Sequence, residues 1–405
     1  MDRRTLLTAM LGTAACSLWT PPDAFALGLP KDRIKRIRYY KTPTDAAGRP
    51  NIHQPTFNQS TNIVVIETAG GLIGIGEGGE PSTMEQCAGM LIGEDPFRIQ
   101  HLWQVMERGY FYPAGREKTH SLGALDVALW DLKGKALGVS VLELLGGPVH
   151  EKLPAIASCH GHFASIPKMV EEAQEWLSTG LRGVKTGFGK RGDAHLGYEH
   201  DRDVEYVKAM REGIGADKML MIDCGIRVVW DVTGAVRRAR DMEEYKLDWI
   251  EEPLGAWDPE GYANLRAKTT TRIAYGEREW TLDQFERVLA TGTVDVVGVD
   301  PGRAEGITGF KKICDRVEFY RRQANAHAWS SAIVTAASLA ISFSTPACKL
   351  FEFKPLRNPM QHDLVAKPFD HVNGWVFPPT GPGLGIEVNE DVINGYRSEK
   401  VLNKK

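Results

Sequence analysis

From residue 153 onward, short apolar runs alternate with longer segments whose apolar residues recur at helical spacing. Each run is short enough for one buried strand, and each longer segment can form the helix that leads to the next strand. In the segment 232–245, for example, Ala235, Ala239 and Met242 lie on one stripe. The predicted strands cover residues 153–159, 183–185, 219–223, 247–251, 272–277, 294–300, 323–327 and 349–353.

Eight strands joined by helices close into a barrel, because right-handed crossover connections leave few other arrangements. No amphipathic helix follows the eighth strand, where Pro355 and Pro359 lead into a Pro- and Gly-rich tail. We therefore predict an α/β fold, a modified TIM barrel of the (β/α)7β type, over residues 151–354. The C-terminal segment 355–405 is expected to return to the N-terminal domain.

Residues 27–150 follow a different pattern, which predicts an α+β capping domain. The predicted strands are 33–40, 62–68 and 72–76, and the predicted helices are 83–107 and 119–137. The strands alternate polar and apolar residues and are expected to form a small antiparallel sheet. Between the first two strands, residues 41–60 have no periodicity, and loops of that length often act as lids.

The composition of the chain excludes some classes of partner. Its 405 residues are 42% hydrophobic and 25% charged, and the formal net charge is -3. A basic excess that would attract nucleic acid or anionic lipid is therefore missing, and a small-molecule ligand is the default expectation. The six cysteines are scattered without a CxxC motif, so neither a zinc site nor a disulfide framework is predicted.

Residues 1–26 are predicted to be an export signal of the twin-arginine type. The pair Arg3-Arg4 precedes the uncharged stretch 5–20 and the cleavage-like site Ala24-Phe25-Ala26. We expect a periplasmic or secreted protein that does not contact a membrane after the signal is removed. A frayed N-terminal helix is the plain alternative, and lipidation at Cys16 is a minor one.

A reactive side chain ends each of six successive predicted strands. These residues are Asp223, Glu251, Glu277, Asp300, His327 and Glu352, at separations of 28, 26, 23, 27 and 25 residues. That near-constant step fits one strand, one helix and two loops per unit. The sequence therefore predicts that the chemistry lies at the C-terminal ends of the barrel strands.

Three of these residues, Asp223, Glu251 and Glu277, end consecutive strands and are predicted to converge on one rim of the barrel. Hard oxygen ligands without Cys or His indicate Mg²⁺ rather than zinc. Three carboxylates around one divalent cation leave a negative charge, which Lys185 at the end of the second strand can offset.

Asp300 and His327 are predicted to lie on the opposite wall, where a carboxylate can orient an imidazole as a general acid or base. Taken singly, each residue has a structural alternative. An acid at a strand end is often a helix cap or a solvated rim charge, Asp300 could form a turn before Pro301-Gly302, and His327 could be structural. The repetition of the pattern, rather than any one residue, favours a functional site.

In these residues the chain resembles the mandelate racemase branch of the enolase superfamily. The barrel motifs are Gly183-Val184-Lys185-Thr186-Gly187, Asp223, Trp249-Ile250-Glu251-Glu252-Pro253-Leu254, Gly276-Glu277, Asp300 with Gly306-Ile307-Thr308, His327-Ala328-Trp329-Ser330 and Phe351-Glu352-Phe353. The capping-domain motifs are residues 124–135 and Leu144-Leu145-Gly146-Gly147. The resemblance runs in order over residues 33 to 390 or so, and the set of motifs is highly specific.

The resemblance implies a role for each residue. Asp223, Glu251 and Glu277 would be the Mg²⁺ ligands, Asp300 and His327 the catalytic dyad, and Glu352 the acid that faces the substrate carboxylate. It also implies removal of a proton next to a carboxylate, which gives an enolate intermediate. Reprotonation of that intermediate is racemisation, loss of a β-hydroxyl is dehydration, and ring opening is cycloisomerisation.

One departure from the family pattern guides the choice among these reactions. The branch commonly carries Lys-x-Lys on the second strand, where this chain has Lys185-Thr186-Gly187. The change disfavours two-base racemisation and makes His327 the principal base and acid. Lys185 would bind the carboxylate or partly replace the missing lysine, and Lys190 is a weaker candidate for that replacement.

Beyond these residues, two charged neighbours follow Glu277 directly. Arg278 and Glu279 either reach the ligand or form a solvated loop pair.

Our leading expectation is an exported Mg²⁺-dependent lyase that dehydrates a sugar acid. The enzymatic alternatives are a racemase or epimerase and a cycloisomerase of a hydroxy or sugar acid. The non-enzymatic alternative is an exported protein that binds a sugar acid. Because barrels of this kind often assemble, we also expect a homo-oligomer.

Overall fold

The computed structural model describes residues 28–40, 62–109, 115–160, 163–189, 195–225, 227–256, 258–327, 331–356 and 359–389, together with the backbone of 399–403. From Asp32 onward the chain forms one compact unit. The predicted export signal, 1–26, and the predicted lid loop, 41–60, lie outside the described residues. Of the helices in the described part, none is long and apolar enough to cross a bilayer.

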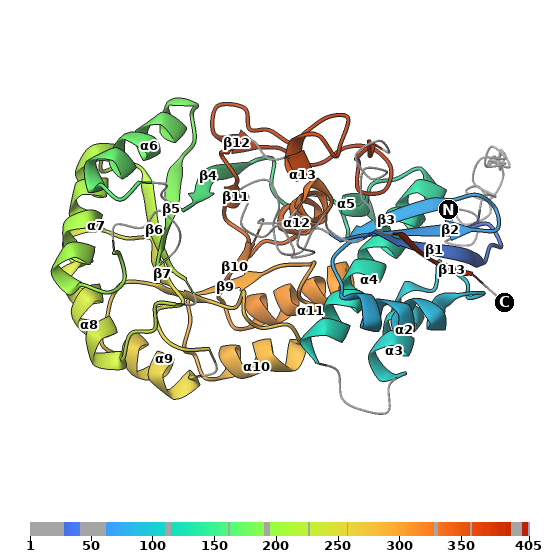
Figure 1. The fold of residues 1–405 in the computed structure, drawn as a ribbon, viewed down its shortest axis with the longest axis horizontal. Coiled ribbons are helices and arrows are strands. Elements are labelled where there is room, and N and C mark those ends of the chain that lie inside the picture. Colours follow the sequence, from blue (N-terminus) through green and yellow to red (C-terminus); the bar gives the residue numbers. More distant parts are fainter. Residues whose placement is uncertain are drawn as a thin grey trace, which may run out of the picture. The chain divides into compact units, whose positions relative to one another are not determined.

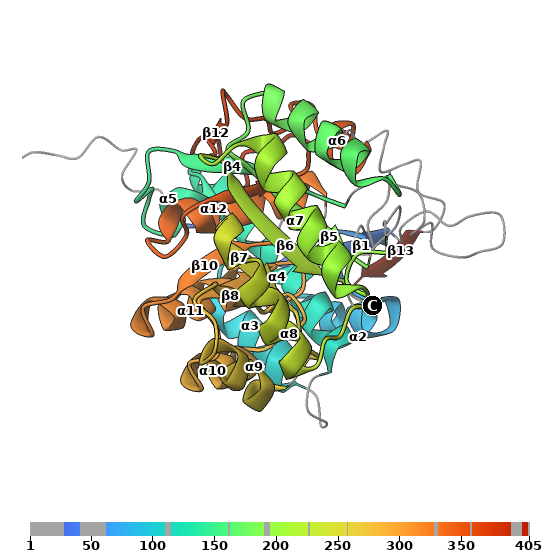
Figure 2. The same cartoon turned by 90° about the vertical axis from the view of Figure 1, so that its left-hand side faces the viewer.

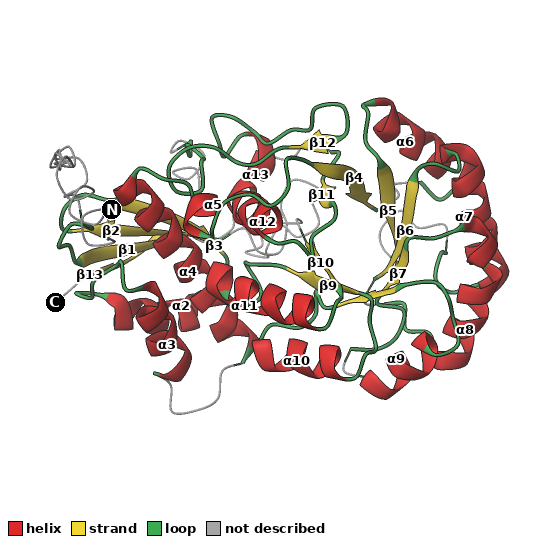
Figure 3. Ribbon diagram, turned by 180° about the vertical axis from the view of Figure 1, so that it is seen from behind, coloured by secondary structure: helices red, strands yellow, loops and turns green. Residues whose placement is uncertain are grey.

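Eight parallel strands form the barrel, as the sequence predicts (Figure 3). They are β4 (Leu153–Cys159), β5 (Gly183–Phe188), β6 (Met219–Cys224), β7 (Trp249–Glu251), β8 (Ile273–Tyr275), β9 (Val296–Val299), β10 (Gln323–Ala326) and β11 (Phe351–Phe353). Their order in the sheet is β10-β9-β8-β7-β6-β5-β4-β11. A parallel bridge between Ala324 of β10 and Cys348, just ahead of β11, joins the two ends of this path.

Seven helices connect these strands, one in each crossover (Figure 1). They are α6 (Ile166–Ser178), α7 (His200–Ile214), α8 (Val232–Asp241), α9 (Pro259–Arg266), α10 (Leu282–Ala290), α11 (Gly306–Phe319) and α12 (Ala332–Ser344). Several begin at a residue that satisfies a free backbone N–H: Asp231 accepts from Gly234 N at 2.6 Å, and Thr281 and Gln284 form a capping box. Helices α6 to α9 lie side by side around one flank of the barrel (Figure 2).

The capping domain contains the predicted antiparallel sheet, made of β1 (Ile34–Tyr40), β2 (Ile63–Thr68) and β3 (Ile73–Glu77). Against this sheet packs α4 (Arg116–Leu137), whose predicted range was close to the observed one.

The prediction of one helix over 83–107 was wrong. The chain forms α2 (Pro81–Leu91) and α3 (Ile99–Arg108), separated by Gly93 at φ 86° and by Pro96. A left-handed residue and a missing N–H donor both end a helix.

The C-terminal segment returns to the capping domain, as predicted. Strand β13 (Glu399–Asn403) pairs antiparallel with β1, and Leu384 N donates to the Asp131 carboxylate of α4 at 2.9 Å. After β11 the chain forms α13 (Pro359–His362), a helix of four residues, in place of an eighth long helix. Strand β12 (Trp375–Val376) pairs antiparallel with β4.

The apolar core has three parts that follow this architecture. One cluster fills the space between the barrel strands and their helices, and a second lies under the capping sheet. The third, small cluster includes Met221 and Trp249. These two precede Asp223 and Glu251 by two residues, and strand residues two apart point to the same side. The third cluster is therefore an apolar floor beneath the acids at the strand ends.

A buried acid of the capping domain attaches α4 to the barrel. The Asp126 carboxylate accepts hydrogen bonds from Thr308 N at 2.8 Å and Thr308 Oγ1 at 2.7 Å, in the first turn of α11. Trp130 Nε1 donates to the same hydroxyl at 2.9 Å. Burial raises the pKa of Asp126 to about 7, although the bonds from Thr308 oppose that rise. The junction between the domains is thus polar and ionisable as well as apolar.

This acid predicts a pH-dependent stability. An Asp in the unfolded chain ionises near pH 4 or so, whereas Asp126 in the folded chain holds its proton until about pH 7. The contribution of protonated Asp126 to the free energy of unfolding is therefore fully present below the unfolded pKa, and it is lost as the pH rises through about 7. Asp126→Asn should destabilise the protein by roughly 1–3 kcal/mol at pH 5, because a hydrogen-bond acceptor is lost. The difference from wild type should shrink at pH 8, since Asn does not titrate.

Urea unfolding of both proteins at the two pH values measures this difference. Asp201→Asn, at an acid with a 95% exposed side chain, serves as the control. An equal wild-type-to-variant difference at both pH values would show that Asp126 does not titrate as described.

Candidate active site

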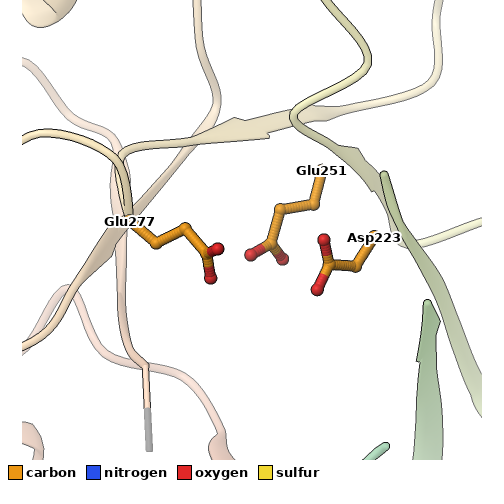
Figure 4. Close-up of side chains that lie close together, drawn as sticks. All are labelled: Asp223, Glu251 and Glu277. Carbon is orange, nitrogen blue, oxygen red and sulfur yellow. The ribbon is translucent and has the colours of Figure 1, made fainter. Parts of the chain in front are cut away.

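Three carboxylates meet at the C-terminal end of the barrel, as the sequence predicts. Asp223 lies in β6 opposite Glu251 of β7, and Glu277 follows β8 after one intervening residue, Gly276. One oxygen from each carboxylate lies within 4.8 Å of the others. Figure 4 shows the three side chains reaching toward one another. This arrangement is the one group of potential metal ligands found among the described residues.

The ammonium group of Lys185 lies among these acids and is buried, with 2% of the residue exposed. Its Nζ is 3.0 and 2.9 Å from the two oxygens of Glu251, 2.8 Å from Glu352 and 3.9 Å from Asp223. Burial disfavours the charged ammonium, but the surrounding carboxylates outweigh it and hold the pKa of Lys185 well above its usual value. Lys185 is therefore the internal counter-charge of the site.

The same crowding affects the central acid. Burial raises the pKa of Glu251 to about 7, and the neighbouring Asp223, Glu352 and Glu277 act in the same direction, while Lys185 opposes them. Several oxygen donors with one ammonium leave an excess of negative charge that a second cation would balance. Asp223, Glu251 and Glu277 fit a divalent cation by both their donor type and their spacing.

Asp300 and His327 form the predicted pair on neighbouring strands. The Asp300 Oδ2 atom lies 2.9 Å from His327 Nδ1, and Asp300 Oδ1 accepts from Gly302 N at 2.7 Å. Asp300 is therefore both the turn former and the partner of the imidazole. Burial disfavours the charged carboxylate, yet the bond from His327 and the charge of Arg303 hold the pKa of Asp300 below its usual value. An ionised Asp300 fixes which ring nitrogen of His327 carries the proton.

The other ring nitrogen faces the acid cluster. His327 Nε2 lies 3.1 Å from Glu277 Oε2, so the imidazole borders the candidate metal site directly. The backbone of His327 is also held, because its N–H donates to Val299 O of β9 at 2.8 Å. These contacts place one ring nitrogen at the centre of the site.

Glu352 of β11 completes the ring of acids. It accepts hydrogen bonds from Ser158 Oγ at 2.8 Å and Asn325 Nδ2 at 2.6 Å, in addition to its ion pair with Lys185. Neither Ser158 nor Asn325 was predicted from the sequence. Asn325 precedes His327 by two residues, so the alternation of side chains along a strand could have placed it in the site.

The adjacent acids Glu251 and Glu252 point to different partners. Glu252 has φ 49° and pairs with Arg278 Nε at 2.5 Å, away from Lys185. Arg278 also donates to Cys224 O at 3.0 Å, and Glu279, which is 3% exposed, accepts from Tyr275. The idea that Arg278 and Glu279 form a solvated pair was therefore wrong, because both help to pack the wall behind the metal cluster.

The position that would hold a second lysine is glycine. Gly187 lies in β5 opposite Asp223 of β6, and Lys185 precedes it by two residues on the same strand. Lys190 lies outside the described residues. Of the candidate bases from the second strand, Lys185 is thus the one that the described structure places in the site.

Comparison with known proteins agrees with this geometry. Residues 50–146 match the mandelate racemase/muconate lactonizing enzyme N-terminal domain, and residues 168–392 match the enolase C-terminal domain-like family. The chain therefore belongs to the mandelate racemase/muconate lactonizing enzyme branch of the enolase superfamily.

Three relatives illustrate the range of activities around it. D-galactarolactone cycloisomerase of Agrobacterium fabrum is 29% identical over 84% of this chain and 92% of its own length. D-galactonate dehydratase of Pectobacterium atrosepticum is 32% identical over 81% of this chain and 88% of its own. The structure of L-talarate dehydratase from Polaromonas sp. JS666, in complex with Mg and L-glucarate, has a TM-score of 0.77 and 26% identity, covering 93% of this chain and all (100%) of that one.

The carboxylate cluster predicts that a divalent cation stabilises the protein. After treatment with a chelator, added Mg²⁺ should raise the thermal midpoint, because binding to the folded state alone contributes about 2.7 kcal/mol at one hundred times the dissociation constant. Asp223→Asn should weaken or abolish this rise, and the exposed control Asp201→Asn should retain it. A thermal midpoint of the wild-type protein that does not change with Mg²⁺, Mn²⁺ or Ca²⁺ would contradict the assignment of a metal site.

Proposed function

We propose that this member of the enolase superfamily is a Mg²⁺-dependent dehydratase of a sugar acid. The observation that carries the proposal is the Asp300–His327 pair, whose second ring nitrogen, Nε2, borders the three-carboxylate cluster. A positioned base beside a cation site is the arrangement that proton removal next to a carboxylate requires. The dehydratases among its relatives support the choice of reaction.

His327 would remove the α-proton of the substrate through Nε2. Asp300 holds the Nδ1 proton and stabilises the imidazolium that forms, which leaves Nε2 to take the substrate proton. In the structure this nitrogen contacts Glu277 at 3.1 Å, so the reacting carbon would have to lie close to that acid. The base and the candidate metal ligand thus act on adjacent atoms of one substrate.

Asp223, Glu251 and Glu277 would hold Mg²⁺, which would supply positive charge to the substrate carboxylate as the α-proton leaves. Lys185 carries a second positive charge between Glu251 and Glu352 and would bind the same carboxylate. Glu352, held by Ser158 and Asn325, would face the oxygen that gains charge. Mg²⁺ and the Lys185 ammonium would stabilise this negative charge, and Glu352 would hold the ammonium beside it.

Elimination then completes the reaction with a single acid–base residue. The imidazolium of His327 returns a proton to the departing β-hydroxyl, the carbon–oxygen bond breaks, and water leaves. The remaining enol converts to a 2-oxo acid. This course needs no second base, in agreement with Gly187 at the position where the family commonly has a lysine.

A second candidate is a cycloisomerase, favoured by the similarity to D-galactarolactone cycloisomerase. Incubating sugar acids and their lactones in D₂O separates the possibilities by mass spectrometry. Apart from hydrogens exchanged with the solvent, a dehydratase product is lighter than the substrate by one water and a cycloisomerase product has the mass of the substrate, whereas an epimerase deuterates the substrate without elimination. An acid that binds tightly but never changes would indicate a binding protein instead.

We further propose that the protein is exported and assembles into a homo-oligomer. Export rests on the Arg3-Arg4 pair and the Ala24-Phe25-Ala26 site of the sequence. The N-terminal sequence of the protein recovered from the periplasm tests the first proposal, and light scattering of the purified protein tests the second.

The proposal makes His327 indispensable for α-proton exchange. His327→Asn should reduce both exchange in D₂O and turnover by about 10²–10⁴-fold, because general acid–base catalysis contributes that much. Lys185→Met should weaken substrate binding as well as turnover. The two variants are compared with wild type for exchange, elimination and the Mg²⁺-dependent thermal midpoint.

Retention of the Mg²⁺ response in His327→Asn is the control that its carboxylate cluster is intact. If that variant still exchanges the α-proton at the wild-type rate, the base is another residue, and Lys185 or Lys190 becomes the candidate.

A further inference from the structure

One buried carboxylate of the capping sheet contacts a helix of the barrel domain. Glu77, the last residue of β3, is 0% exposed and accepts hydrogen bonds from Ser331 N at 3.0 and 3.1 Å. It also accepts from Ser331 Oγ at 2.5 Å and from Val334 N at 3.3 Å. Ser331 is the N-cap of α12, so Glu77 satisfies backbone donors that the first turn of this helix leaves free.

The helix that Glu77 holds begins directly after the proposed base. His327 follows β10, and Ser331 begins α12, with residues 328–330 between them. His327 is fixed at its backbone by Val299, and Ser331 is fixed by Glu77. The two ends of this short connection are thus held by different domains, the first by the barrel and the second by the capping domain.

The backbone beside Glu77 also fits closely against the loop that follows Asp300. Gly78 has φ 119°, and a Cβ atom placed there would lie 3.1 Å from Gly302 O. A Cβ atom on Gly302 would in turn lie 3.1 Å from both Asp300 Oδ1 and Val334 Cγ2. The end of β3 therefore lies against both the loop after Asp300 and the first turn of α12.

A carboxylate at this place is not the choice that stability alone would favour. Burial raises the pKa of Glu77 to about 8, and the bonds from Ser331 only partly oppose that effect. Removing an acid from water costs folding free energy, and an apolar side chain of similar volume would avoid the cost. A side chain that is costly to bury but bonded to one helix start is well suited to fixing position.

We propose that Glu77 is a positioning residue for catalysis, which holds the start of α12 so that His327 stays aligned with Asp300 and the carboxylate cluster. The inference rests on the proposed role of His327 as the base. The hydrogen bonds of Glu77 within the described part of the chain go to Ser331 and Val334, and to none of the candidate metal ligands. Its effect acts through Ser331, the N-cap of α12, and through the contact of the Glu77–Gly78 backbone with Gly302 in the loop after Asp300.

Glu77→Gln is the central variant because it keeps the size of the side chain and replaces one acceptor oxygen with a donor. Glu77→Asp keeps the carboxyl group but is shorter by one methylene, and it should restore part of the lost function. The matched control is Asp131→Asn, which removes another buried carboxylate of the capping domain. Asp131 accepts from Ile75 N at 3.0 Å and Leu384 N at 2.9 Å and makes no described contact with α12.

Two readouts need no substrate. In hydrogen–deuterium exchange, Glu77→Gln should speed exchange at the first turn of α12 by about tenfold or more, while Asp131→Asn leaves that turn unchanged. In carbethoxylation by diethyl pyrocarbonate, His327 of Glu77→Gln should react several times faster than in wild type, because its surroundings are loosened. Peptide mass spectrometry locates both effects.

The third readout uses D-galactonate and the acids that the wild-type enzyme turns over in the D₂O assay. Glu77→Gln should lower kcat by about ten- to a hundredfold with KM within about threefold, and Asp131→Asn should lower thermal stability without changing kcat of the folded protein. If Glu77→Gln does not fold, Ser331→Ala keeps the backbone N–H that donates to Glu77 but removes the hydroxyl, which also accepts from Ile333 N at 3.1 Å, and it should show the same pattern in weaker form.

Unchanged reactivity of His327 in a variant with a loosened α12 would overturn the positioning role, and so would an unchanged kcat. Failure of the proposed function has a different signature. In that case His327→Asn would retain full activity, or wild type would act on no acid, while the two substrate-free readouts would still report on the contact between Glu77 and α12.

Discussion

The interaction on which the active end of the barrel depends is the repulsion among four crowded carboxylates around one ammonium group. Asp223, Glu251, Glu277 and Glu352 come from the ends of four different strands, and the Lys185 ammonium offsets part of their charge from within. Four negative charges against one positive would drive separate peptides apart in a medium of low dielectric constant. The apolar clusters on both sides of the strands hold these acids together, so the folding energy of the barrel maintains a site that favours binding of a cation.

The capping domain uses carboxylates in a second way. Asp126 and Glu77 accept hydrogen bonds from backbone N–H groups at the starts of α11 and α12. These two helices are the ones that follow Asp300 and His327. The acids of the barrel therefore concentrate negative charge at the site. The two acids of the capping domain hold the starts of α11 and α12, the helices that follow the dyad. The capping domain therefore contacts the helices that follow both members of the dyad.

The sequence contained enough information to predict the barrel and its ring of acids, because both follow from local rules. A strand–helix unit has a nearly constant length, and the chemistry of a barrel lies at the strand ends, so Asp223 through Glu352 could be found by counting. The contact between Glu77 and Ser331 joins residues 254 positions apart, and no periodicity in a single chain points to it. The contacts of Arg278 with Glu252 and Cys224 were missed for the same reason. By contrast, the break between α2 and α3 could have been predicted, because Gly93 and Pro96 are visible in the sequence.

The pair Glu251 and Glu252 shows how the fold gives two identical side chains different partners. Successive strand residues point to opposite sides, and the positive φ of Glu252 turns the chain further at the strand end. Glu251 thereby meets Lys185 in the interior of the barrel, and Glu252 meets Arg278 behind it. Each acid has a separate cation: Glu252 pairs with Arg278, although burial still holds the pKa of Glu252 well above its usual value, and Glu251 shares its lysine with Glu352. Orientation toward Asp223 and Glu277, rather than any difference between the two residues themselves, places Glu251 and not Glu252 in the candidate metal site.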